Sequence, residues 1–233
     1  MSNFDSDGFQ SNEWEDRGEL AWSEFDWERY LRSQDETLVR YLAAYDPIAD
    51  AHGRIDEVAR QLGWDPTDTW DTGEEEPDDE DDSKVEAPQS SEDFDPYTVH
   101  RNPVFIATRA LFTSTTFFAE RVAEDPAKFP PRLAVAFLRH LHNAEISAVL
   151  AIQGLDLGDY ALGISLLKRA LASLNHAIGE LPAAEADRNK HFAKFRDYAL
   201  PRLFDLREIW LRVMNECRDE LGRPVEDEGE EEG

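Results

Sequence analysis

Residues 131–154 read PRLAVAFLRHLHNAEISAVLAIQG, and this stretch decides the fold class. Its apolar side chains recur at helical spacing, at Phe137, Leu141, Ala144, Ala148 and Ala151. This spacing predicts an amphipathic α-helix with one buried face. The helix is expected to begin at Pro131, since proline is tolerated in a first helical turn, and to run toward Gly154.

Helices of the same kind are predicted on both sides of this stretch. Asn102 followed by Pro103 indicates a capped helix start, and the helix is expected to continue to Val122, with Phe117 widening its apolar face. After a turn at residues 156–159, another helix is expected to reach Gly179. The alternation of polar and apolar residues that is typical of strands is absent from the sequence. The predicted fold class is therefore all-α, an antiparallel helical bundle with short connections.

The last part of the bundle is predicted as two helices. Pro182 is expected to open the first, which should stop at Pro201 because proline lacks a backbone N–H. The second is expected from Leu203 to Leu221, with Cys217 on its apolar stripe. A thiol on such a stripe indicates a buried core residue, and a single cysteine excludes an internal disulfide and fits a reducing compartment.

An aromatic-rich helical arm is predicted before the bundle, at residues 21–64. Ser23 and Asp26 have the spacing of a capping box, so a helix should begin there and run to Tyr45. Asp46 and Pro47 are then expected to cap and open a second helix that Gly63 ends.

Acidic residues are concentrated in three segments. The net charge is −27, of which residues 1–20, 71–100 and 222–233 carry −5, −12 and −5. Segments this charged and this poor in apolar residues are typical of disorder. The predicted organisation is an acidic disordered N-terminus at 1–20, the arm at 21–64, an acidic disordered linker at 65–100, the bundle at 101–222 and an acidic disordered tail at 223–233. With no apolar leader or long apolar run, we expect a cytoplasmic protein without membrane contact.

One hairpin resembles a tetratricopeptide repeat. The resemblance is carried by Gly158, Asp159, Tyr160, Gly163, Leu167, Ala170 and Leu171, with Leu150 and Ala151 in the first helix. It covers about residues 147–180 and departs from the family pattern at Ser147, Gly154 and Asn175. It implies one repeat-like helical pair inside a larger bundle, and partner binding rather than catalysis. The small residues Ala151, Gly163 and Ala170 are expected to let the two helices approach closely.

Several histidines give the sequence an alternative function. His140, His142 and Glu145 lie on one predicted helix and His176 on the next, so a metal- or small-ligand-binding bundle is conceivable. The Glu-x-x-His spacing of di-iron bundles is absent, however, and His140 and His142 point to different faces. No cofactor is therefore predicted, and the four residues stay weak metal candidates.

A basic run supports a third function. Arg188, Lys190, His191, Lys194, Arg196 and Arg202 alternate with Phe192, Phe195 and Tyr198. Such a pattern at residues 188–202 can bind nucleic acid, but the net charge of the chain repels a polyanion. We therefore favour a solvated helix face, with both phenylalanines turned inward and with Arg188 and Lys194 as candidate contacts for a protein.

The sequence thus favours a non-enzymatic protein–protein interaction or scaffold module. It contains no nucleophile-elbow motif and no phosphate-binding glycine loop, so no catalytic residue is predicted. Trp22, Trp27 and Tyr30 are the leading binding candidates, because large aromatic residues anchor many interfaces. Two alternatives stay open: the arm packs on its own bundle, or it binds another protein or a second copy.

Overall fold

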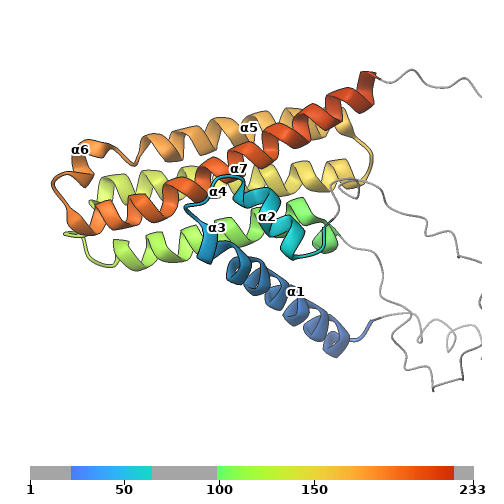
Figure 1. Cartoon of the computed structure of the whole chain (residues 1–233), viewed down its shortest axis with the longest axis horizontal. Helices are drawn as coiled ribbons and strands as arrows, with labels where there is room; N and C mark the ends of the chain where they lie inside the picture. Colours follow the sequence, from blue (N-terminus) through green and yellow to red (C-terminus); the bar gives the residue numbers. More distant parts are fainter. Residues whose placement is uncertain (1–21, 65–98, 223–233) are drawn as a thin grey trace, which may run out of the picture. The chain divides into compact units, whose positions relative to one another are not determined.

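The computed structural model describes residues 22–64 and 99–222 (Figure 1). Every regular element in these two ranges is a helix, so the predicted all-α class is confirmed. A hydropathy search of the described helices finds none with the length and apolar character of a membrane span. The acidic segments expected at 1–20, 65–100 and 223–233 lie almost entirely outside the described residues. The chain divides into two compact units between Thr37 and Leu38.

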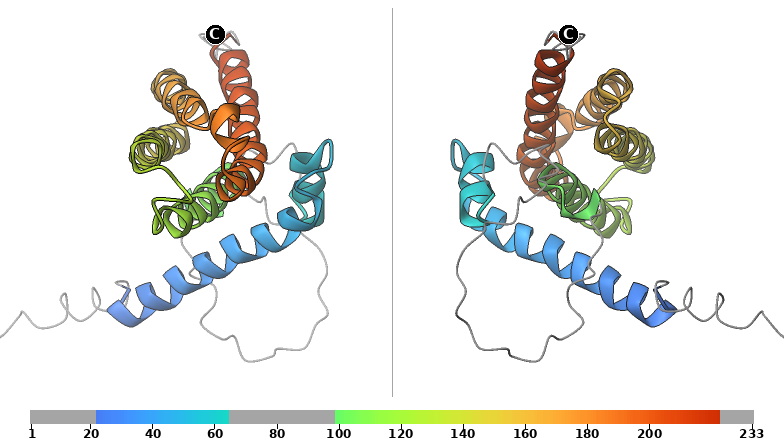
Figure 2. Two further views of the ribbon diagram at one scale, coloured as in Figure 1. Left: turned by 90° about the vertical axis from the view of Figure 1, so that its left-hand side faces the viewer. Right: turned by 90° about the vertical axis from the view of Figure 1, so that its right-hand side faces the viewer.

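Four long helices form the bundle of the second unit. They are α3 (Pro103–Ala123), α4 (Pro131–Asp156), α5 (Tyr160–Gly179) and α7 (Lys190–Gly222). Helix α4 packs between α3 and α5, and α7 packs between α5 and α3. Figure 2 shows α4 and α5 nearly end-on, with α7 seen obliquely beside α5. Their core is filled by large fully buried side chains, among them Trp210, Phe112, Phe129, Phe137, Phe192 and Phe195.

The start of α3 follows the predicted chemistry. The Asn102 side chain accepts hydrogen bonds from the backbone N–H groups of Val104 and Phe105, at 2.9 and 3.2 Å, and Pro103 occupies the first turn. Further along, the Trp210 indole N–H donates to the Thr108 hydroxyl at 3.2 Å, so a polar pair is satisfied inside the core. The prediction for Phe117 is wrong: its side chain is 68% exposed.

A tight turn joins α4 and α5 into a hairpin. Gly158 adopts a left-handed backbone with φ +77°, and the Asp159 carboxylate caps α5 by accepting from the Leu162 N–H at 2.9 Å. A Cβ atom at Gly163 would lie 2.2 Å from Cδ2 of Leu155. The close helix approach expected at Gly163 is therefore present, and a side chain there would require Leu155 to move.

The prediction that a helix ends at Pro201 is wrong, because α7 continues through this residue. Proline removes one helical N–H and crowds the preceding turn. Here the carbonyls around it receive side-chain donors: Arg202 Nη1 donates to Tyr198 O at 2.8 Å and Arg54 Nη2 donates to Pro201 O at 3.2 Å. Burial of neighbouring residues such as Leu203 also holds both sides of the proline in one helix. The short α6 (Ala183–Ala186) precedes α7.

Helix α1 (Glu24–Tyr45) begins at the predicted capping box. The Asp26 N–H donates to the Ser23 hydroxyl at 3.3 Å, and the Ser23 N–H donates back to the Asp26 carboxylate at 3.0 Å. The helix crosses the division between the two units, so its residues from Leu38 onward belong to the second.

The helix predicted to start at Asp46 and Pro47 begins later. These residues form only a 3-10 turn, η1 (Asp46–Ile48), and α2 (Arg54–Gln61) follows Gly53, which has φ +70°. Asp46 makes no cap because its carboxylate is 2.5 Å from Arg202 Nη2. Gly63, with φ +75°, follows the end of α2 as expected. A second 3-10 turn, η2 (Val99–Arg101), precedes α3.

Candidate functional site

Three aromatic rings form a cluster at the start of α1, which we call the arm cluster: Trp22 lies just before the helix, and Trp27 and Tyr30 lie in its first half. The Trp22 ring centroid lies 4.7 Å from that of Trp27 and 5.2 Å from that of Tyr30. The Trp27 and Tyr30 rings meet edge-to-face at 6.1 Å, a favourable aromatic geometry. Tyr30 is buried, whereas Trp27 is 48% exposed. The structure therefore brings together three of the five residues that we predicted as partner contacts.

The exposed part of this cluster belongs to a longer face of α1 that is apolar except at one position. Trp27, Leu31, Gln34, Leu38, Tyr41 and Tyr45 follow one another at spacings of four and three residues. Residues spaced in this way lie on one side of a helix, and Gln34 is the polar exception among them. Tyr41 and Tyr45 are fully buried in the core of the second unit, while Leu31 is 49% exposed. The apolar face thus extends into the first half of α1, where it is open to solvent.

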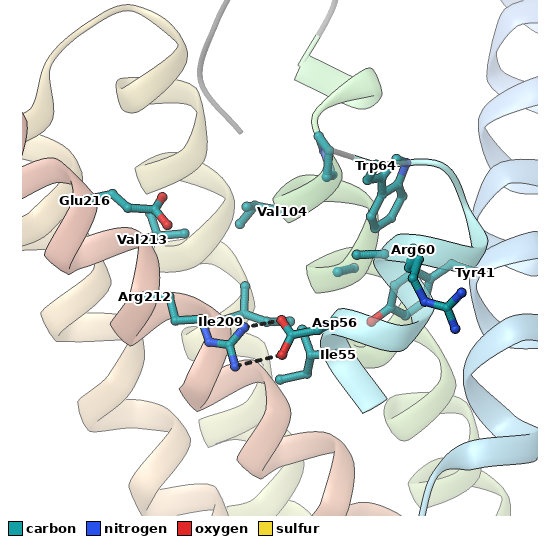
Figure 3. Close-up of a pocket in the computed structure, with 13 residues that line it drawn as sticks. Tyr41, Ile55, Asp56, Arg60, Trp64, Val104, Ile209, Arg212, Val213 and Glu216 are labelled. Atoms are coloured by element: carbon teal, nitrogen blue, oxygen red, sulfur yellow. Dashed lines mark hydrogen bonds and ion pairs between the residues drawn. The ribbon is translucent and has the colours of Figure 1, made fainter. Parts of the chain in front are cut away.

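A separate pocket of about 420 Å³ lies between α2, α3 and α7 in the second unit (Figure 3). Its lining is mostly apolar, from Ile55, Ala59, Val104, Ala107, Ile209 and Val213. Tyr41 and Trp64 line one side, and Pro103 with four charged residues, Asp56, Arg60, Arg212 and Glu216, completes the lining. We call this the α2–α7 pocket.

The aromatic side of the pocket is a stack of three rings. Tyr41 stacks on Trp64 with centroids 5.9 Å apart and on Tyr45 with centroids 6.0 Å apart. The Tyr45 hydroxyl donates to Asp205 Oδ2, and Arg54 holds both oxygens of that carboxylate, at 2.6 and 2.7 Å. Burial and the bond to Asp205 raise the pKa of Tyr45 well above its ordinary value. This buried hydrogen-bonded network fixes the stack against α7.

A buried arginine reinforces the same region. Arg202 of α7 pairs with Asp46, and its guanidinium carbon lies 3.6 Å from the Tyr198 ring centroid and 5.2 Å from that of Tyr45. Its Nε atom is buried and has no hydrogen-bond partner in the part of the chain that the structure describes. The cation–π contacts place the delocalised charge against two rings and tie η1 to α7.

An ion pair crosses the edge of the pocket. Arg212 of α7 binds the Asp56 carboxylate of α2 through both terminal nitrogens, and its Nε donates to Glu208 at 3.0 Å. The hydrogen bond that Arg212 donates to Asp56 is the main reason that the pKa of Arg212 is raised. Figure 3 shows the pair facing across the gap between the two helices, below Val213 and Ile209.

The four metal candidates are not brought together. His140 and His176 stack with ring centroids 5.1 Å apart, but Glu145 pairs with Arg109 instead, and His142 is exposed. Desolvation, followed by Arg139 and His176, lowers the pKa of His140. Within residues 22–64 and 99–222, no group of three or more potential ligands is arranged to hold a metal ion.

The basic run at residues 188–202 is divided by its burial. Phe192 and Phe195 are fully buried, as we favoured from the sequence, and Arg188 and Lys194 are exposed. Arg196 Nε donates to the Leu181 carbonyl at 3.0 Å, and Arg202 is buried. Fewer cations are therefore available at this surface than the sequence suggests.

Cys217 is a core residue, as predicted. Its side chain is buried on α7, and burial raises the pKa of the thiol to about 11. A thiol with so high a pKa holds little thiolate near neutral pH, and thiolate is the reactive form.

The α2–α7 pocket and the network that supports it were not predicted from the sequence. Asp56 and Arg212 are 156 residues apart, and Arg54 and Asp205 are 151 apart, so no local spacing joins them. The one local signal was Trp64, a large aromatic residue directly after the glycine that follows α2. Compared with known proteins, the chain matched no family model, no curated protein and no solved structure.

Proposed function

We propose that the protein is a non-enzymatic interaction module that binds an apolar helix of another protein through the first half of α1. The observation that carries this proposal is the arm cluster, in which Trp27 is half-exposed while it packs on Trp22 and Tyr30. Leu31, one turn further on, extends the same exposed surface. Rings held by their neighbours lose little further freedom on binding, which favours affinity.

The spacing of the residues on this face supports a helical partner. The four- and three-residue intervals from Trp27 to Tyr45 are those of a coiled-coil seam, in which side chains of one helix insert between those of another. In coiled coils, a single polar residue in the seam fixes the register of the paired helices. Gln34 is the polar residue of this seam. In the second half of α1 the seam positions are filled by core contacts, with Tyr41 and Tyr45 buried. In the first half the same positions are available to a second helix.

Charge on the opposite side of α1 keeps this helix compatible with water. The pairs Arg32–Glu28 and Arg29–Asp26 lie on the surface, at 2.8 and 3.6 Å. Exposed pairs of this kind contribute little to stability, but they make one side of the helix polar. The contrast between a polar side and an aromatic side is typical of helices that dock into an apolar groove.

Site-specific photo-crosslinking in the native host tests the proposal. We expect benzoylphenylalanine at position 31 of the full chain to trap a discrete partner. The matched control is the same residue at position 25, because Phe25 is 73% exposed but lies two residues before Trp27 and so faces the other way. Replacing Trp22 and Trp27 with alanine should abolish the product, since interface tryptophans often contribute about 2 kcal/mol or more each.

Two results would contradict this function. Equal crosslinking from positions 25 and 31 would mean that the apolar side is not the binding surface. Crosslinking that persists in the double tryptophan variant would mean that the arm cluster does not anchor the partner. If the trapped product is a second copy of this chain, sedimentation equilibrium should show a dimer that the double variant loses.

A further inference from the structure

The α2–α7 pocket has the size and composition of a small-molecule site. Its volume of about 420 Å³ lies within the roughly 300–1,000 Å³ that is usual for ligand pockets. A cavity of about 150 Å³ accommodates benzene, so this one has room for two or three rings. Val104, Ala107, Ile209 and Val213 supply an aliphatic lining, and Trp64 supplies a ring beside it.

One polar group in this lining has no hydrogen-bond partner among residues 22–64 and 99–222. Tyr41 is 1% exposed and lines the pocket, and among the described residues its hydroxyl makes no hydrogen bond. Its neighbour Tyr45, by contrast, donates to Asp205. The Tyr41 hydroxyl is not one of the fully buried atoms that lack a partner, so it borders the open pocket, where solvent reaches it. A ligand that offers an acceptor would satisfy the Tyr41 hydroxyl.

The charges around the pocket favour an uncharged ligand. Asp56 and Glu216 balance Arg60 and Arg212 in formal charge. Arg212 is already bound by Asp56 and Glu208, and Arg60 by Glu57. A ligand carrying a carboxylate or an ammonium would have to compete with these internal pairs while it lost its own hydration.

We propose that the α2–α7 pocket binds a neutral, largely apolar aromatic molecule of two or three rings that carries one carbonyl or ether oxygen. The rings lie between Trp64 and the aliphatic lining, and the oxygen accepts a hydrogen bond from the Tyr41 hydroxyl. This site is independent of the arm cluster, because all of its residues belong to the second unit.

Fluorescence titration of the full chain with prodan, a neutral naphthalene ketone, tests this site. We expect one prodan per chain with blue-shifted emission, and binding at least tenfold weaker for the anion anilinonaphthalene sulfonate. Tyr41→Phe should weaken prodan roughly threefold to tenfold, the range expected for one hydrogen bond, and should shift its emission further to the blue. Absence of prodan binding, or unchanged affinity and emission in Tyr41→Phe, would overturn the proposal.

A second pair of variants locates the probe. Ala59→Trp should fill the pocket and reduce prodan affinity at least tenfold, whereas Gln61→Trp, on the same helix but outside the lining, should leave it unchanged. Equal affinity in both variants would place the probe elsewhere and refute the site. If Ala59→Trp does not fold, nuclear Overhauser contacts in the wild-type protein show whether prodan occupies the pocket. Contacts from prodan to the methyl groups of Ile209 and Val213 support the proposal, and their absence overturns it.

Discussion

The second half of α1 buries Tyr41 and Tyr45 in the bundle core, whereas the first half leaves Trp27 and Leu31 half-exposed on the same face. The two halves differ little in their pattern, since the four- and three-residue spacing runs through both and is polar only at Gln34. The two halves of α1 differ in the contacts that hold their aromatic side chains. Tyr45 is bonded to Asp205, while the arm cluster consists of rings that pack on one another. Periodicity therefore identifies an apolar face without telling what covers it.

Removal of the carboxylate that anchors the second half should have the largest effect. Asp205→Ala deprives both Tyr45 and Arg54 of their buried partner. Because loss of one member of a buried pair leaves the other charge uncompensated, we expect the free energy of unfolding to fall by about 3–5 kcal/mol. Urea denaturation measures it. As a control, Glu28→Ala removes an exposed pair in the first half and should change stability by less than about 0.5 kcal/mol. Equal effects of the two changes would contradict the contrast between the halves.

The two tyrosines of the second half should respond differently to the loss of a hydroxyl. Tyr45→Phe breaks a hydrogen bond to a carboxylate and should lower the free energy of unfolding by about 1.5–3 kcal/mol. Tyr41→Phe removes a hydroxyl that makes no such bond, so it should be close to neutral or slightly stabilising. Denaturation of both variants under one set of conditions gives the comparison. A larger loss for Tyr41→Phe would show that its hydroxyl is satisfied within the protein.

A change in the first half should leave the bundle nearly unaffected. Trp27 makes its ring contacts with Trp22 and Tyr30, all within the first unit. We therefore expect Trp27→Ala to change the unfolding free energy of the bundle by less than about 0.5 kcal/mol, as is usual for surface substitutions. Thermal melting followed by circular dichroism measures this. A loss of several kcal/mol would mean that the first half of α1 also completes the protein's own core.

The smallest expected effect is at the start of α1. Hydrogen bonds from the Ser23 hydroxyl and backbone N–H lower the pKa of Asp26. A lowered folded-state pKa means that the cap's contribution is present above the ordinary carboxyl pKa of about 3.9 and is lost as pH falls through the folded value. Titration by NMR should give Asp26 a pKa below the ordinary carboxyl value, and Ser23→Ala should raise it. An unchanged value in Ser23→Ala would contradict the capping box.

Local chemistry was predicted well from the sequence. Asn102 and Ser23 cap helices where expected, because a cap depends on residues only two or three positions away. The packing of Leu155 against Gly163 was likewise indicated by small residues in one hairpin.

The errors arose where tertiary contacts override local preference. Pro201 was expected to end a helix, but Arg54, from 147 residues earlier, donates to its carbonyl and buried neighbours hold the helix. Asp46 was expected to cap a helix, but Arg202 takes its carboxylate. The α2–α7 pocket escaped prediction for the same reason, since its ion pair joins residues that are distant in the chain.

The proline inside α7 also bears on local opening of the bundle. Because Pro201 has no amide hydrogen, one carbonyl in the turn before it receives no helical N–H, so this turn of α7 has one hydrogen bond fewer than its neighbours. Arg54 reaches this point from α2. Loss of the Arg54 contact removes a donor from this turn. We therefore expect amide hydrogen exchange around Pro201 to report how often α2 separates from α7.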